Sequence, residues 1–376
     1  MTCVVIAAGG TAGHVVPALA VADALRARGA EVAFVGGERA EAELVPAAGY
    51  PLHRLRVVGI DRRNPLRAAR AIGLAALASA RAPALLRRLR PEVVLGGGGY
   101  VAGPVGLAAV MLRVPLALSE ADSHLGLANR MLAPLARRVF LAFPPRGADG
   151  ADRRARTGAE GGGRFRVTGR PIPAGTLAAD APRSRERFGL PPEGPCLLVF
   201  GGSLGARSLN EAAVEAFGPA PAVDGMSVLH ACGHRDHDEL VARLAELGRP
   251  EHYRLHAYIQ PLADALAAAD LAAARAGGSI FELAAAGVPA VLVPYPQATA
   301  DHQSGNACWM AEGGAAVVVP DSELDAERLR REVAALLEAP ERLAAMSRAA
   351  RALARPDAAE VIADELIALA VPRHDE

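Results

Sequence analysis

The sequence predicts an α/β protein with two domains, each a doubly wound parallel sheet. The chain has 376 residues, more than a single hydrophobic core usually organises. Short, continuously apolar runs alternate with stretches rich in alanine and leucine, which is typical of parallel strands covered by helices on both faces. The two halves of the chain also begin alike, with a strand, a glycine-rich turn and a helix.

The predicted strands form two series. The first series is 3–8, 31–35, 93–95, 115–118 and 139–142, and the second is 196–200, 227–230, 253–258, 271–274, 290–293 and 316–319. A stretch rich in glycine and arginine, 145–163, separates the series and has the composition of a loop. We therefore expect an N-terminal domain over residues 1–168 and a C-terminal domain over residues 169–350. A last helical segment, 351–376, is expected to pack back across the domains.

The composition argues against several classes of protein. The 41 basic residues are all arginine and are matched by 41 acidic residues, so bulk attraction to nucleic acid is not expected. The four cysteines are far apart and form no Cys-x-x-Cys motif, which fits reduced thiols in a cytosol. The first residues do not resemble a signal peptide. The longest apolar helical run, 71–80, stops at Arg81, so we expect no membrane-spanning helix.

Glycine-rich turns follow three of the predicted strands. They are Gly9-Gly10-Thr11-Ala12-Gly13, Gly96-Gly97-Gly98-Gly99 before Tyr100, and Gly201-Gly202-Ser203-Leu204-Gly205. Glycine lets backbone N–H groups approach an anion, and the helix that follows adds its positive end. One such turn could equally serve helix packing, but three in one chain favour binding of a phosphate or diphosphate. No G-x-G-x-x-G or P-loop motif is present, so dinucleotide binding is disfavoured.

Several polar residues near these turns could carry chemistry. His14 starts the first helix and could take a proton from an attacking hydroxyl, or it could only cap the helix or contact an anion. Glu282 lies in the first turns of a predicted helix, 280–286, after Arg275-Ala276-Gly277-Gly278-Ser279. Its carboxylate could accept hydrogen bonds from ribose hydroxyls, or it could merely pair with the helix dipole. The polar side chains of Gln303 and Asn306 are suited to binding the hydroxyl groups of a sugar.

Two further segments each have two interpretations. His230, Cys232, His234 and His237 resemble zinc ligands, but their spacing fits no familiar zinc motif, so a polar loop is favoured and no metal or cofactor is predicted. The stretch 54–90 holds ten arginines, a single acidic residue and interleaved apolar residues. This composition would attract a leaflet of anionic lipid, or it could be a solvated helix face.

Taken together, these segments resemble the MurG family of bacterial glycosyltransferases. The resemblance rests on the segments 9–14, 98–104, 201–207 with Asn210, and 275–287, together with Gln303 and Asn306. It implies a GT-B fold with two Rossmann-like domains facing a cleft, and inverting transfer without a metal or cofactor. The sugar transferred would be N-acetylglucosamine, from UDP-N-acetylglucosamine to undecaprenyl-diphospho-N-acetylmuramoyl-pentapeptide (lipid I). The product would be lipid II, for peptidoglycan synthesis.

The same resemblance implies roles for individual residues. In the C-terminal domain, Ser203 and Gly277, Gly278 and Ser279 would bind the diphosphate, Ile259 the uracil, Glu282 the ribose and Gln303 the sugar, with Arg275 and Asn306 beside them. In the N-terminal domain, Thr11, Ala12, Gly13, Tyr100, Asn129 and Arg170 would bind the acceptor. Our own prediction for the catalytic residues is His14, Asp122 and Glu120. The enzyme would act peripherally at the cytoplasmic face of the cell membrane, docked on the anionic inner leaflet.

Three positions depart from the family pattern. Ser119-Glu120-Ala121-Asp122 stands where the family usually has His-Glu-Gln-Asn, so Asp122 could replace His14 as the base. Pro173 replaces a usual arginine, for which Arg170 could compensate, and the turn from Arg275 to Glu282 is one residue shorter than usual. The alternatives are a transferase acting on diacylglycerol or a secondary metabolite, a nucleotide-sugar epimerase, and a nucleotide-sugar-binding partner without catalysis.

Overall fold

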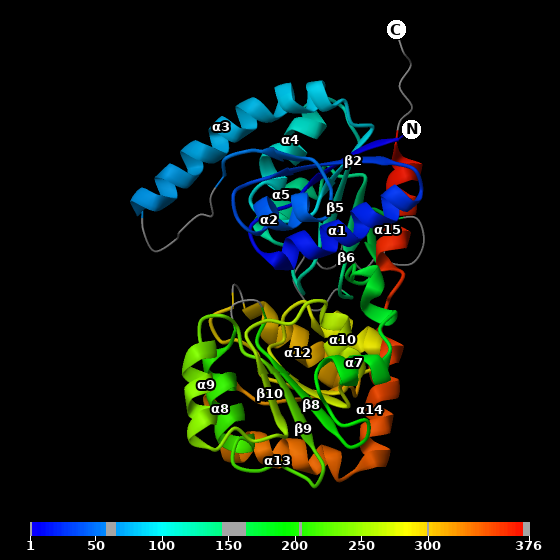
Figure 1. Cartoon of the computed structure of the whole chain (residues 1–376). Helices are drawn as coiled ribbons and strands as arrows, with labels where there is room; N and C mark the ends of the chain where they lie inside the picture. Colours follow the sequence, from blue (N-terminus) through cyan, green and yellow to red (C-terminus); the bar gives the residue numbers. More distant parts are fainter. Residues whose placement is uncertain (1, 58–64, 145–162, 203–204, 299–300, 371–376) are drawn as a thin grey trace. The chain divides into compact units, whose positions relative to one another are not determined.

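The computed structural model of the protein describes residues 2–57, 65–144, 163–202, 205–298 and 301–370. The chain divides into two compact units (Figure 1). Unit 1 consists of Met1–Pro173 and Arg355–Glu376, and unit 2 consists of Ala174–Ala354. Each unit contains one sheet in which all paired strands are parallel. The predicted α/β class with two parallel-sheet domains is therefore confirmed.

The sheet of unit 1 has seven strands in the order β3-β2-β1-β4-β5-β6-β7. The strands are β1 (Cys3–Ala7), β2 (Glu31–Gly36), β3 (Leu52–Arg54), β4 (Val93–Gly96), β5 (Leu116–Glu120), β6 (Arg138–Leu141) and β7 (Phe165–Val167). The helices are α1 (Ala12–Ala27), α2 (Ala40–Ala47), α3 (Pro65–Leu89), α4 (Ala102–Met111), α5 (Leu127–Leu132) and α15 (Ala358–Leu369). Val4, Val5 and Ile6 are fully buried because helices cover both faces of the sheet, as the uninterrupted apolar run predicts.

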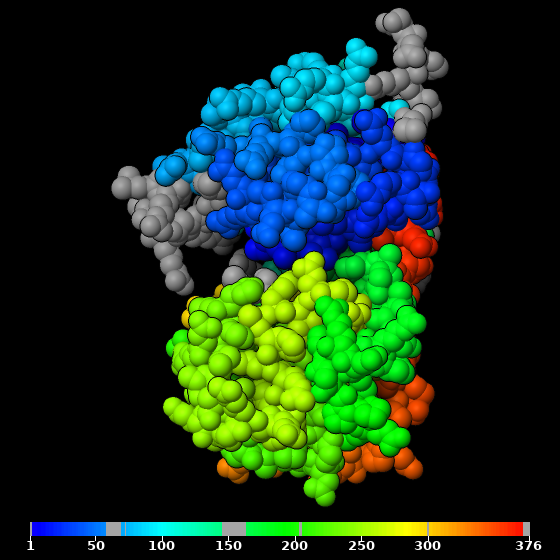
Figure 2. Space-filling view, viewed as in Figure 1, coloured from blue at the N-terminus to red at the C-terminus, as the bar shows by residue number. Residues whose placement is uncertain are grey.

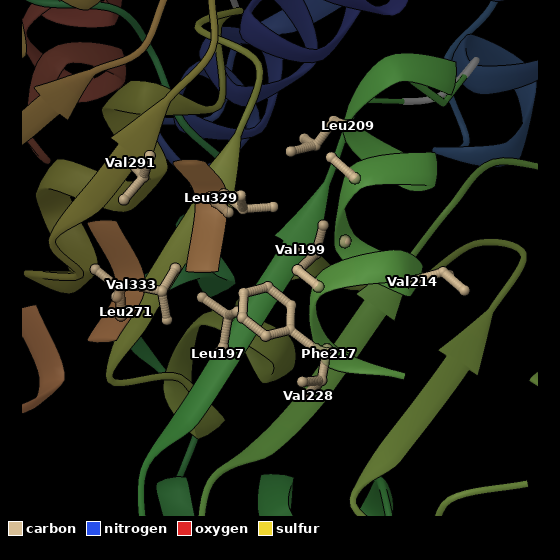
Figure 3. Close-up of a cluster of buried hydrophobic side chains, with 14 of the residues drawn as sticks. Leu197, Val199, Leu209, Val214, Phe217, Val228, Leu271, Val291, Leu329 and Val333 are labelled. Atoms are coloured by element: carbon tan, nitrogen blue, oxygen red, sulfur yellow. The ribbon is translucent and has the colours of Figure 1, made fainter. Parts of the chain in front are cut away.

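The sheet of unit 2 has six strands in the order β10-β9-β8-β11-β12-β13. The strands are β8 (Cys196–Phe200), β9 (Ser227–Ala231), β10 (Tyr253–His256), β11 (Leu271–Ala274), β12 (Ala290–Leu292) and β13 (Ala316–Val318). The helices are α7 (Ala181–Arg187), α8 (Arg207–Phe217), α9 (His237–Glu246), α10 (Leu262–Ala268), α11 (Ile280–Ala286), α12 (His302–Glu312), α13 (Ala326–Leu337) and α14 (Pro340–Leu353). In the core, Phe217 of α8 lies beside Leu197 and Val228 of the sheet (Figure 3).

Helix α3 corrects one expectation from the sequence. It runs through Arg81 to Leu89, because arginine is a good helix former and its exposed charge does not end a helix. The segment Ala69–Leu89 is therefore long and apolar enough, by length and by a mean hydropathy of 1.2, to cross a membrane. In unit 1, however, this helix packs against α4 and contributes Ala82 and Leu86 to the core.

The last helix, α15, completes unit 1. Ile362 and Leu366 are fully buried in the same hydrophobic cluster as Leu25 of α1. On the rim of this contact, Arg28 forms an ion pair with Asp364 at 2.5 Å. The core of unit 1 is thus built from both ends of the chain.

The strand order reverses once in each sheet, between β1 and β4 in unit 1 and between β8 and β11 in unit 2. The two strands at a reversal send their following helices to opposite faces of the sheet. The loops at their carboxyl ends therefore diverge and leave a crevice, where ligands of this fold class bind. All three glycine turns, and the segment that begins at Arg275, follow one of these four strands.

Candidate functional site

The turn after β1 presents the start of α1 at the surface of unit 1. Gly10 has a φ of +105°, a conformation that favours glycine, and Thr11 is the N-cap of the helix. Thr11 and Gly13 are exposed, while Ala12 and His14 are half-buried. No acidic side chain lies in the first turn of α1. The positive end of the helix can therefore attract an anion here.

The turn after β4 packs directly on the turn after β1. A Cβ atom on Gly99 would lie 1.9 Å from the carbonyl oxygen of Gly9, and one on Gly98 would lie 2.6 Å from Nδ1 of His14. The glycines are therefore needed for the close approach of the two loops. The structure thus brings Thr11, Ala12, Gly13, His14 and Tyr100 to the carboxyl ends of two neighbouring strands.

The loop after β5 is organised by Glu120. Its buried carboxylate accepts hydrogen bonds from the backbone N–H of Gly126 at 2.8 Å, from Nδ2 of Asn129 at 3.0 Å, and from the N–H of Asp122 at 3.2 Å. Burial raises the pKa of Glu120, and the hydrogen bonds from Gly126 and Asn129 partly offset that effect. Glu120 and Asn129 therefore shape this loop from the inside, whereas Asp122 is only half-buried.

Arg170 connects this loop to the first glycine turn. Its guanidinium donates to the carbonyl oxygen of Gly13 at 2.5 Å and to that of Ala121 at 3.1 Å, and the residue is 6% exposed. A planar guanidinium can hold two carbonyl groups at a fixed separation, which a lysine ammonium cannot do. Arg170 thus sets the spacing of His14 and Asp122 through the backbone of their neighbours.

Sequence reasoning missed Glu41, a buried residue of α2. Its carboxylate accepts hydrogen bonds from the backbone N–H of Gly10 and from that of Gly37, both at 2.8 Å. The available signal was a second glycine pair, Gly36-Gly37, at the end of a predicted strand, followed by a helix with an acidic first turn. Glu41 fixes the turn after β1 from the side of the core.

In unit 2, the turn after β11 is open toward solvent. A Cβ atom on Gly277 would meet no atom within 4 Å, so there is room in front of the turn. Ser279 is the N-cap of α11, Glu282 lies in its first turn, and Gly287 ends it with a φ of +71°. The half-buried Gly277, Gly278 and Ser279 thus stand at the positive end of a helix, as the sequence predicts.

Arg275 and Asn306 hold this turn from inside the unit. Arg275 is 7% exposed, donates to the carbonyl oxygen of Val293 at 3.1 Å, and forms an ion pair with Asp321 at 2.6 Å. Nδ2 of Asn306 donates to the carbonyl oxygen of Ala276 at 3.0 Å. Both side chains are buried, so they support the turn and are not exposed along their whole length to a ligand.

The remaining predicted residues of unit 2 lie near the carboxyl ends of β10 and β12. Ile259 is buried, and the neighbouring Tyr258 is half-exposed and stacks on His234 with a centroid distance of 6.2 Å. Gln303 accepts a hydrogen bond from the backbone N–H of Tyr295 at 2.9 Å. Ser203 lies outside the described residues.

His230 lies in β9, at the start of the histidine-rich segment, and is part of a buried hydrogen-bond chain. His230 bonds to the hydroxyl of Tyr253 through Nδ1 at 2.8 Å and to Oδ1 of Asn210 through Nε2 at 3.1 Å. Nδ2 of Asn210 donates to Asp236 at 3.0 Å and to the carbonyl oxygen of Cys232 at 2.8 Å. Both ring nitrogens of His230 are therefore engaged. Among the described residues, no group of three or more His, Cys, Asp or Glu side chains could hold a metal ion.

Three adjacent helices of unit 1, α3 to α5, carry apolar side chains on the surface. Figure 2 shows α3, in light blue, on the outside of its unit. Among the described side chains, the large exposed hydrophobic residues on or beside these helices include Leu77, Leu107, Met111, Leu127, Met131 and Leu135. Arg130 and Arg137 are exposed on the same segment of chain. We call this set the α3–α5 surface.

The chain matches two family descriptions. Residues 4–141 match the glycosyltransferase family 28 N-terminal domain, and residues 196–362 match the glycosyltransferase family 28 C-terminal domain. Together these matches cover most of the chain.

Curated relatives align over nearly their whole length. The UDP-N-acetylglucosamine--N-acetylmuramyl-(pentapeptide) pyrophosphoryl-undecaprenol N-acetylglucosamine transferase of Moorella thermoacetica is 42% identical over 367 residues, which is 96% of each chain. The protein of the same name from Acidithiobacillus ferrooxidans is 44% identical over 363 residues, again 96% of each chain.

Solved structures agree with the fold. Acinetobacter baumannii MurG aligns with a TM-score of 0.75 and 30% identity over 98% of this chain and 100% of that one. A UDP-N-acetylglucosamine 2-epimerase aligns with a TM-score of 0.66 over 97% of this chain and 96% of that one. Its identity is only 15%, so this second likeness concerns the fold alone.

Proposed function

The chain belongs to glycosyltransferase family 28, and from this membership we propose that it makes lipid II. It transfers N-acetylglucosamine from UDP-N-acetylglucosamine to undecaprenyl-diphospho-N-acetylmuramoyl-pentapeptide (lipid I), a step of peptidoglycan synthesis. The observation that carries this function is the identity of 42% to 44% with the transferases of that name, over 96% of each chain.

Unit 2 would bind the donor. The open turn Gly277–Ser279 at the start of α11, with Ser203, suits the diphosphate, because backbone N–H groups and a helix end can take its charge. Glu282 would accept from the ribose hydroxyls, Ile259 would contact the uracil, and Gln303 would bind the sugar. Arg275 and Asn306 support these residues through their buried contacts.

Unit 1 would bind the acceptor. Its diphosphate would meet Thr11, Ala12 and Gly13 at the start of α1, with the exposed Tyr100 beside them. Arg170, Asn129 and Glu120 would position this region by their hydrogen bonds to the backbone and to each other.

The reaction joins the acceptor oxygen to the anomeric carbon of N-acetylglucosamine while the bond from that carbon to UDP breaks, with inversion. The departing diphosphate needs stabilisation of its charge, which helix ends and N–H groups can supply. A base takes the proton of the attacking hydroxyl. His14 is the first candidate, since it lies in the first turn of α1 next to the exposed Thr11 and Gly13, and Asp122 is the second.

The primary test measures release of UDP from UDP-N-acetylglucosamine with and without a lipid I analogue. We expect release only when the analogue is present. Equal release with diacylglycerol would favour a transferase with a different acceptor. Binding of the nucleotide sugar without turnover would instead favour a non-catalytic partner.

The base is identified by comparing His14→Ala with Asp122→Asn over a range of pH. If His14 is the base, His14→Ala lowers kcat by 100-fold or more and removes the pH dependence on the acidic side, in line with the roughly 10² to 10⁴-fold contribution of a general base. Asp122→Asn would then retain most of its turnover. Full turnover of His14→Ala at every pH would assign the base elsewhere.

The same proposal includes docking on the anionic inner leaflet of the cell membrane. The basic stretch 54–90 would contribute the exposed Arg70, Arg81, Arg87 and Arg88 of α3, and the α3–α5 surface would contribute apolar side chains. Exposed Met111 and Met131 would enter the interface, and arginines such as Arg130 would pair with lipid phosphates. Met131→Glu should weaken sedimentation with vesicles containing anionic lipid, and added salt should weaken that of the natural protein. Val241→Glu, which places the same charge on an exposed apolar position of unit 2, is the matched control and should bind as the natural protein does.

A further inference from the structure

Glu41 of α2 is a buried acidic side chain next to the proposed acceptor-binding turn. It is 1% exposed, and no basic side chain in the described parts of the chain forms an ion pair with it. Its two oxygens instead accept hydrogen bonds from Gly10 and Gly37, each at 2.8 Å. A buried carboxylate is costly unless such contacts compensate it, so this arrangement points to a specific task.

The two hydrogen bonds join loops that follow different strands. Gly10 lies in the turn after β1, and Gly37 follows β2. The carboxylate occupies the space that a side chain on either neighbouring glycine would need. A Cβ atom on Gly9 would lie 2.7 Å from Oε1, and one on Gly37 would lie 2.8 Å from the same atom. Glu41 therefore lies between the two loops, with one oxygen on each.

This contact determines how the peptide between Gly9 and Gly10 is oriented. Its N–H points to Glu41 in the core, and its carbonyl oxygen lies on the other side, against Gly99. The chain then enters α1 through Thr11 with extended dihedral angles, a φ of −115° and a ψ of 160°. The Gly10 N–H is thus already used, and the residues that remain for an anion are those at the start of α1.

We infer that Glu41 is a positioning residue of the transferase, which fixes the turn after β1 so that the start of α1 can bind the acceptor diphosphate. This inference rests on the proposed function of unit 1. Glu41 acts through the backbone of Gly10 and touches no substrate. It should consequently affect the acceptor and leave the donor, which unit 2 binds, unaffected.

The first variant is Glu41→Gln. A carboxamide has one oxygen, so it can accept a hydrogen bond from only one of the two backbone N–H groups. Its own NH₂ group is a donor and would face the other N–H, which is also a donor. We expect the KM for a water-soluble lipid I analogue with a short isoprenyl chain to rise about tenfold or more, consistent with the loss of one charge-assisted hydrogen bond. The KM for UDP-N-acetylglucosamine should stay unchanged.

A second variant, Gly37→Ala, keeps the charge and displaces the carboxylate with the added methyl group. It should raise the acceptor KM in the same direction. Glu43→Gln, on the exposed side of the same helix, is the matched control and should leave both KM values unchanged. Hydrogen exchange of the peptide covering residues 8–14 gives a readout independent of activity, and it should become faster in both variants but not in the control.

The outcomes separate the two proposals. If the natural protein does not transfer to the lipid I analogue, the proposed function fails. Suppose instead that the natural protein does transfer to the analogue. The inference about Glu41 is then overturned if Glu41→Gln and Gly37→Ala leave the acceptor KM unchanged or lower it. It is also overturned if the donor KM rises as much as the acceptor KM. A variant with lower thermal stability and both KM values unchanged would likewise assign Glu41 a purely structural role.

Discussion

Gly98 and Gly99 illustrate how neighbouring glycines in one turn can be required by different contacts. Both have positive φ, at +96° and +77°. An added methyl group on Gly99 would meet a backbone oxygen of Gly9, which cannot move away, whereas on Gly98 it would meet the side chain of His14, which can rotate. The two positions should therefore respond differently to the same substitution.

We predict that Gly99→Ala mainly lowers stability and that Gly98→Ala mainly lowers activity. Positive φ alone costs an alanine about 1 to 2 kcal/mol, and the backbone clash at Gly99 adds to that cost. Gly98→Ala should fold but displace His14, so that kcat falls further than the melting temperature suggests. Thermal unfolding and kcat are measured together. Gly73→Ala, in open space on α3, is the control and should stabilise the protein by roughly 0.5 to 1 kcal/mol.

At this scale the sequence indicates which loops carry the candidate site, but not how their residues are held. A glycine after a strand, as at Gly9 or Gly277, is visible in the sequence because it interrupts an apolar run. The contacts of Glu41 and Arg170 are not visible, because they join segments 31 and 157 residues apart. The contacts of Glu120 with Gly126 and Asn129 span only 6 and 9 residues, but no local pattern shows that these side chains turn into the loop.

Among the elements, the strands that pass through the centre of each sheet follow the predicted runs closely. The prediction of 271–274 coincides with β11, and that of 196–200 coincides with β8. The strands that the sequence failed to indicate, β3 and β7, lie at the two edges of the sheet of unit 1. An edge strand pairs with only one neighbouring strand, so it can be short and contain arginine. Such a strand lacks the continuous apolar run by which the central strands are predicted.

Elements α8, β9 and β10 are linked by the hydrogen-bond chain through His230. Complete burial lowers the pKa of His230 to about 3, from an ordinary value of 6.5. The neutral ring is therefore favoured in the folded state. Below pH 6.5 the unfolded chain binds a proton that the folded chain does not, so stability falls as the pH falls toward 3.

We predict that unit 2 loses roughly 1 kcal/mol of stability per pH unit through His230 as the pH drops below 6. The measurement is chemical unfolding between pH 4.5 and 7.5, followed by hydrogen exchange of β9 peptides. In His230→Gln the pH slope should be smaller, even though the variant is less stable overall. His234→Asn removes an exposed histidine from the same segment and should leave the slope unchanged. An equal slope in His230→Gln would contradict the assignment.

For the whole molecule, the two units have separate cores, which leads to a reciprocal prediction. Ile362 of α15 is fully buried in unit 1, and Leu336 of α13 is fully buried in unit 2. Ile362→Ala should destabilise unit 1 by about 2 to 5 kcal/mol and leave unit 2 unchanged, while Leu336→Ala should do the reverse. Hydrogen exchange of peptides from β1 and β8 distinguishes the units. Equal loss of protection in both would show that the units unfold as one.

The sequence predicts two parallel-sheet domains and a final helix, because repeated strand–turn–helix units and amphipathic helices are local signals. It does not show on which core that helix packs, since the match between the apolar face of α15 and that of α1 is a tertiary property. The ion pair of Arg28 with Asp364 joins residues 336 positions apart and is equally hidden from local patterns.

The return of α15 to unit 1 has a consequence for synthesis on the ribosome. Unit 2 is encoded by one uninterrupted stretch, Ala174–Ala354, so all its residues have been translated before those of α15. The β-strands of unit 1 are translated early, yet the apolar surface of α1 stays uncovered until α15 has been translated. The nascent chain can thus complete its second domain before its first, and premature termination before Ala358, the first residue of α15, would expose a hydrophobic face to chaperones and proteases.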